Sequence, residues 1–147
     1  MVLDSRESRQ IWNRAIRVSL MSPTERSDLG LRPGDEALAA VLELDSPAGN
    51  GGLLHGIEVV GDEKVRAAID GLTYLGLDDA AFVVADITAR LQRLERINDE
   101  DAIEDLEVEA GHRYWRVANG EAITRAVDRR MESSPDDFAE VTRSWEL

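Results

Sequence analysis

A run of acidic residues between Asn98 and Gly111 has its apolar residues at helical spacing, and this combination leaves few folds open to the chain. The run holds seven carboxylates and no basic residue. Steps of three and four between apolar residues are the period of an amphipathic α-helix, not of a strand. Here those steps connect Ile103, Leu106, Ala110, Tyr114 and Val117. We therefore predict a helix that takes Asn98 or Asp99 as its N-cap and ends near Ala118.

Apolar residues at the same spacing mark most of the remaining chain as helical. Residues 53–60 lie between glycines and are assigned to a short helix, with a strand as the alternative. Ser22-Pro23-Thr24-Glu25 is a capping signal for one short turn, and Ser133 to Phe138 is a start signal for a last one. The longer helices are predicted over residues 6–21, 35–44, 62–75, 78–97 and 121–131. Since no segment alternates as a strand does, the sequence predicts an all-α single domain over residues 1–147, a bundle of about six or seven helices with short loops.

Three details of this prediction can be compared directly with a structure. Asp45 to Gly52 is the richest stretch in helix breakers and is expected to be a loop, with Asn50-Gly51-Gly52 as a tight turn that needs positive φ. In the helix over residues 78–97, Phe82 is expected to point inward with Val83, Ile87, Leu91 and Leu94. The arginines of the first helix are expected to face water: Arg6, Arg9, Arg14 and Arg17.

The charge of the chain limits the class of partner that it can bind. The formal net charge is −13 in 147 residues, of which residues 1–34 carry +2 and residues 35–147 carry −15. Such a surface repels nucleic acid and anionic membranes, so we expect no direct binding to either, and a basic protein is the partner that fits. Hydrophobic residues make up 43% of the chain, too many for a disordered acidic tail.

The sequence carries no signal for export, membrane insertion or a bound cofactor. It has no cysteine, and therefore no disulfide and no thiolate metal site. The first ten residues lack the apolar core of a signal peptide, and no apolar run reaches the roughly 18 residues that span a bilayer. We therefore expect a cytoplasmic protein without a cofactor.

Several short motifs, taken in order, resemble one known family. Asn50-Gly51-Gly52 is followed by a short hydrophobic segment, a helix that ends in Leu75-Gly76, and an alanine-rich helix. Further along, an acidic stretch with the aromatic pair Tyr114-Trp115 leads to a helix and then to Ser134-Pro135-Asp136-Asp137-Phe138. This order is similar to that of the acidic, all-helical domain family named after a DNA-mimic protein, most of whose members have no assigned function.

The resemblance covers roughly residues 35–147 and leaves the basic N-terminal helical segment, residues 1–34, outside it. The chain has Leu53 where the family usually has Phe, and Gly56-Ile57 in place of an aromatic pair. The resemblance implies a helical bundle, often a homodimer, whose named member presents carboxylates in place of DNA phosphates to a DNA-binding regulator. No motif aligns the acidic run here with that member's contact residues, so none of them is transferred.

The acidic run is the candidate binding site. A helix rises about 1.5 Å per residue, so seven charges over eleven residues amount to about one per 2.4 Å, against about one per 1.7 Å in duplex DNA. Like charges one turn apart cost about 0.2–0.5 kcal/mol each, so the run destabilises its own helix by about 1–2 kcal/mol. The candidate contacts are Asp99, Glu100, Asp101, Glu104, Asp105, Glu107 and Glu109.

Two interpretations of this run stay open from sequence. It can be a solvated face that serves solubility, with Arg90, Arg93, Arg96 or Arg113 neutralising it in space. It can also be a docking surface, on which aligned carboxylates attract Arg and Lys side chains and speed encounter. In the second case Trp115 can add an apolar anchor, whereas Tyr114 is expected in the core.

No catalytic motif accompanies the acidic run. Neither His55 nor His112 belongs to a metal-binding His-x-x-x-His pattern. Helical nucleotide pyrophosphatases bind Mg²⁺ through Glu-Glu-x-x-Glu on one helix, but here the position three after Asp105 is Val108. We therefore expect a non-catalytic protein that binds a basic partner, with a DNA-binding regulator as the partner that the resemblance implies. An immunity-type inhibitor of a basic nuclease toxin needs the same surface, and a carboxylate-based metal-dependent hydrolase is the remaining alternative.

Overall fold

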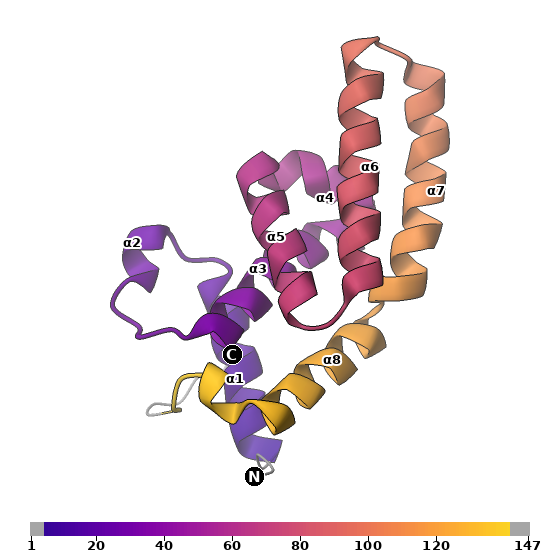
Figure 1. Cartoon of the computed structure of the whole chain (residues 1–147). Coiled ribbons are helices and arrows are strands. Elements are labelled where there is room, and N and C mark those ends of the chain that lie inside the picture. The colour runs from indigo at the N-terminus through magenta and orange to yellow at the C-terminus, as the bar shows by residue number, and fades with distance from the viewer. Residues whose placement is uncertain (1–4, 142–147) are drawn as a thin grey trace.

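The helices form where apolar residues recur at helical spacing, and the side chains of Ser22, Asp99 and Asn119 cap the helices that follow them. The computed structural model describes residues 5–141, and this part of the chain contains no strand. In chain order the elements are α1 (Ser5–Val18), α2 (Pro23–Arg26), α3 (Pro33–Gly51), α4 (Leu53–Val60), α5 (Asp62–Tyr74), α6 (Asp78–Arg96), α7 (Glu100–Ala118), α8 (Gly120–Ser133) and the 3₁₀ turn η1 (Pro135–Asp137). Because α2 is a single turn, the described residues form seven longer helices, and the predicted all-α bundle is confirmed (Figure 1).

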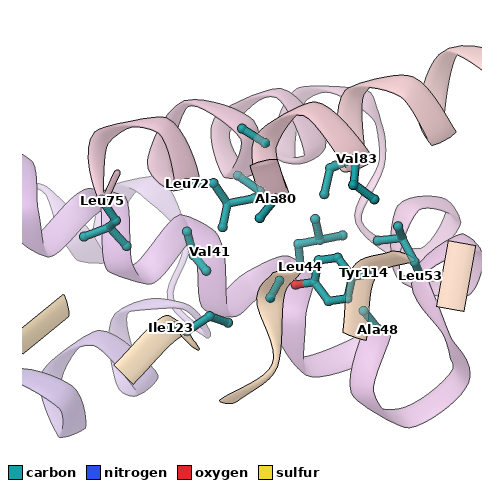
Figure 2. Packing of buried hydrophobic residues seen from close by; sticks show 14 of the residues in the cluster. Val41, Leu44, Ala48, Leu53, Leu72, Leu75, Ala80, Val83, Tyr114 and Ile123 are labelled. Carbon is teal, nitrogen blue, oxygen red and sulfur yellow. The ribbon is translucent and has the colours of Figure 1, made fainter. Parts of the chain in front are cut away.

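Helix α3 lies at the centre of the bundle, where α1, α4 and α5 pack against it. Leu38, Val41 and Leu44 on α3 are almost completely buried. Figure 2 shows the core around this helix, with side chains from the helices α4 to α8: Leu53, Leu72, Ala80, Val83, Tyr114 and Ile123. A central helix that is covered from several sides explains why α3 is apolar over most of its circumference.

Helices α6 and α7 form an antiparallel hairpin whose free end projects past the other helices (Figure 1). The connection is short, and Asn98 takes the left-handed conformation at φ 54° that lets the chain reverse. The Asp99 carboxylate accepts a hydrogen bond of 3.1 Å from the Ala102 backbone N–H, so Asp99 is the N-cap of α7. Of the two predicted caps, Asn98 and Asp99, the structure has Asp99, which places the start of the acidic run at the tip of the hairpin.

The structure corrects the loop predicted over Asp45 to Gly52. Helix α3 continues through Pro47 and ends only at Gly51, and Gly52 makes the turn with φ 93°. Proline removes one backbone hydrogen bond, but burial of Leu44 and Ala48 against neighbouring helices stabilises the extra turns. The tight turn with positive φ was correctly predicted at the end of this stretch, and residues 53–60 form the expected short helix.

Two side chains point in the direction opposite to the prediction. Phe82 is 66% exposed, because the buried stripe of α6 runs through Ala80, Val84, Ile87 and Leu91, which places Phe82 on the outer face. Arg14 was expected in water but is buried in an ion pair with Asp35, at 2.7 Å.

The buried ion pair holds the C-terminal segment against α1 and α3. Arg14 also donates to the backbone carbonyls of Ala139 at 2.9 Å and Glu140 at 3.2 Å. The second oxygen of the Asp35 carboxylate accepts from the backbone N–H groups of Ala139 and Arg32, at 2.8 and 3.1 Å. One carboxylate therefore joins three segments that are distant in sequence.

Candidate functional site on the α6–α7 hairpin

The acidic run occupies the N-terminal part of α7, and the helical period decides which of its residues face solvent. Leu106, Ala110 and Tyr114 lie on the buried face, as predicted. The opposite face is exposed over the whole helix. Six of the seven predicted contacts are exposed: Asp99, Glu100, Asp101, Glu104, Asp105 and Glu107.

Glu109 is set apart from the other six by two arginines. Its carboxylate accepts hydrogen bonds from both Nη atoms of Arg90 and, at 3.2 Å, from Arg113. Arg113 also donates to Asp86 at 2.6 Å, so two acids and two bases form a closed network across the hairpin. The Arg90 guanidinium, followed by Arg113, holds the pKa of the Glu109 carboxyl below its usual range. Glu109 is therefore already neutralised within the fold.

The six exposed carboxylates have no such partner in the described part of the chain. Arg90 and Arg113, two of the four arginines expected to neutralise the run, are bound to Glu109 and Asp86. Arg93 shares a shallow groove of about 280 Å³ with Asp105 but makes no ion pair with a described residue, and neither does Arg96. Over residues 5–141, the N-terminal part of α7 thus carries six exposed carboxylates without an ion pair.

Apolar side chains continue the exposed face of α7 beyond the carboxylates. Val108 is 62% exposed and Trp115 is 71% exposed, and the steps from Asp101 through Glu104, Val108 and Gly111 to Trp115 are three or four residues long. A methyl group added at Gly111 would meet no atom within 4 Å, so the surface between Val108 and Trp115 is open. The sequence predicted a role for Trp115 but not for Val108, although both follow from the same helical period.

Tyr114 points in the opposite direction, into the core, as expected (Figure 2). Its hydroxyl donates a hydrogen bond of 2.8 Å to the carboxylate of Asp45 on α3. Burial raises the pKa of Tyr114 and also the pKa of Asp45, because both charged forms lose hydration. Asp45 was hidden from sequence analysis because its position was assigned to a loop.

Replacing Asp45 with Asn is expected to raise the free energy of unfolding at neutral pH. A pKa that is raised in the fold gives a stability contribution that is complete below the unfolded pKa and is lost as pH rises through the folded value. Asn has no charge to bury, and its carbonyl still accepts from the Tyr114 hydroxyl. Urea denaturation followed by circular dichroism should show a larger gain at pH 7 than near pH 4, and an equal gain at both would contradict the argument.

Three further observations concern the described residues. Among them, no three His, Asp or Glu side chains converge as a metal ion requires. None of the helices over residues 5–141 has the length and apolar character needed to cross a membrane. His55 and His112 are both exposed surface residues.

Comparisons of the chain with protein-family models, with curated proteins and with solved structures find no match. The resemblance to the DNA-mimic family therefore stays a prediction, and the observations that bear on function are those on the α6–α7 hairpin.

Proposed function

We propose that the protein is a non-catalytic binder of a basic protein and that the exposed face of α7 is its docking surface. The observation that carries this proposal is that six carboxylates of one helix are exposed and have no basic partner within residues 5–141. A fold that needs acidity only for solubility can spread it over its surface or pair it, as this chain does at Glu109.

Electrostatics favour a basic partner at this surface. Glu100 and Glu104 lie one turn apart, as do Asp101 and Asp105, and each such pair of like charges costs about 0.2–0.5 kcal/mol. Only the carboxylates of the first turn are offset by the helix dipole, which leaves Glu107 uncompensated. A cationic partner removes this repulsion when it binds, so the same interaction favours the complex and speeds its formation at low salt.

The row of carboxylates supports a partner that normally contacts a phosphate backbone. The charges follow one helix axis at a spacing near that of duplex DNA, and arginine and lysine bind carboxylates and phosphates in similar ways. Val108 and Trp115 offer an apolar contact that DNA lacks, which would favour the complex over simple ion exchange. A DNA-binding regulator is the partner proposed, and a basic nuclease meets the same requirements.

Affinity capture with three forms of the chain tests this function. The first is the wild-type protein, and the second replaces four acids of the docking surface, as Asp101→Asn, Glu104→Gln, Asp105→Asn and Glu107→Gln. The third changes the net charge equally on other exposed helices, as Glu63→Gln, Asp70→Asn, Asp128→Asn and Glu132→Gln. Each tagged protein is incubated at low salt with lysate of the source organism, and proteins released by a salt step are identified by mass spectrometry.

We expect one basic DNA-binding protein or nuclease to be retained by the wild type and by the third form, and lost from the second. Excess duplex DNA should displace it, because both ligands then compete for one basic surface. Equal retention by the second and third forms would mean that net charge alone is responsible. Capture of nothing but abundant basic proteins would equally contradict the proposal.

A further inference from the structure

A second surface of the molecule, separate from the hairpin tip, has the form of a ligand site. A groove of about 720 Å³ lies over α3, with α1 along one side and the junction of α4 and α5 along the other. Helices α1 and α4 both pack on α3. The groove is the space that remains between α1 and α4 above the middle of α3.

Half of the residues that line this groove are apolar. Ile16 lies in the last turn of α1 and Leu20 follows the end of that helix. Val59 and Val60 come from the end of α4, and Leu42 from α3. Leu20 and Val59 are exposed at the rim, and Leu42 and Val60 are partly buried against the core. Small-molecule sites have volumes of about 300–1,000 Å³ and combine apolar walls with polar groups that fix orientation. The groove has a volume in this range, and six of its twelve lining residues are polar: Ser19, Glu43, Asp45, Ser46, Asn50 and Lys64.

The charges in the groove leave one carboxylate without a cation. Glu43 is bound by Arg26 at 2.8 Å and by Lys64 at 2.9 Å, so that acid is neutralised. Asp45 also lines the groove, and its hydrogen bond from the Tyr114 hydroxyl comes from a neutral donor. Among the described residues no basic side chain pairs with Asp45. Arg26, Lys64, Glu43 and Asp45 are neutral as a set, and Asp45 is the lining carboxylate that a cationic group of a ligand can pair with.

We propose that the groove binds a small organic amine, whose ammonium group pairs with Asp45 and whose apolar body packs between Leu20 and Val59. The ammonium donates charge-assisted hydrogen bonds to the carboxylate oxygens, while Tyr114 holds the carboxylate in place from the core side. A second copy of this chain is disfavoured as the occupant, because each copy carries a net charge of −13. This site does not depend on the function proposed for α7.

The test uses the full chain with labelled methyl groups and three probes of one shape. The probes are 2-phenylethylamine, the neutral 2-phenylethanol and the anionic phenylacetate, and the measured quantities are the methyl shifts of Leu20, Leu42, Val59 and Val60. We expect saturable shifts with the amine, affinity about tenfold weaker for the alcohol, and weaker binding still for the anion.

The variant Asp45→Asn separates a ligand role from a structural one, because Asn keeps the acceptor for Tyr114 and removes only the charge. It should reduce amine affinity to that of the alcohol and leave alcohol affinity unchanged. Glu58→Gln removes the same charge from an exposed residue of α4 that does not line the groove, and it should leave amine affinity unchanged. Equal affinity for amine and alcohol, undiminished amine binding by Asp45→Asn, or no saturable shift with any probe would each overturn the proposal.

Discussion

Replacing Asp35 with Ala is expected to lower the free energy of unfolding by about 3–5 kcal/mol, the cost of removing one partner from a buried ion pair. The side chains of Arg14 and Asp35 are only 4% and 3% exposed, so the guanidinium left behind cannot be rehydrated without opening the fold. The Arg14 Nε atom already has no hydrogen-bond partner among residues 5–141, which increases the dependence of this guanidinium on Asp35. The substitution also removes the acceptor for the Ala139 N–H. Urea denaturation at pH 7 measures the loss.

Two further variants decide whether the charge or the hydrogen bonds dominate. Asp35→Asn keeps an acceptor oxygen but removes the charge, and it should fall between the wild type and the alanine variant. Glu121→Ala breaks the exposed ion pair with Arg125 on α8, which should change stability by no more than about 0.5 kcal/mol. A loss for Asp35→Ala as small as that of Glu121→Ala would show that the pair is hydrated in solution.

The comparison of α3 with α7 shows where sequence reasoning succeeds and where it stops. Local signals were sufficient for α7, because the apolar period lies within the helix and the Asp99 cap directly precedes it. They failed at the end of α3, where Pro47 and three glycines predicted a loop. There the helix is held by tertiary burial of Leu44 and Ala48, which no local signal contains.

Contacts between residues that are distant in sequence could not be predicted from local sequence signals. Arginine is a residue type that is usually exposed to solvent. Burial of the Arg14 side chain is favourable only because of its partners, which lie 21 and about 125 positions away in the sequence. The ion-pair network at Glu109 lies between these two cases, because its residues are neither neighbours in sequence nor far apart. Arg90 and Glu109 are 19 positions apart, but both lie at similar distances from the Asn98 turn. Pairing two helices about that turn would have predicted their contact, and with it the separation of Glu109 from the free carboxylates.

The close approach of α5 to α3 leads to a second prediction of large effect, at Gly71. A Cβ atom there would lie 2.7 Å from the carbonyl oxygen of Ala37 and 3.1 Å from a methyl carbon of Val41. Because the nearer atom is backbone, relief requires the two helices to separate. We therefore expect Gly71→Ala to lower the free energy of unfolding by about 1–3 kcal/mol.

The matched control is Gly111→Ala, since Gly111 also lies inside a helix but has open space around its Cα. Alanine restricts the unfolded chain more than glycine does and is the better helix former, so this change should raise stability by about 0.4–1 kcal/mol. Both variants gain the same helix propensity, and the difference between them isolates the cost of moving α5 away from α3. Thermal and urea unfolding of the two proteins should shift in opposite directions. A shift of both towards higher stability would mean that the two central helices can separate at little cost, and that the core around Val41 is less tightly packed than its burial indicates.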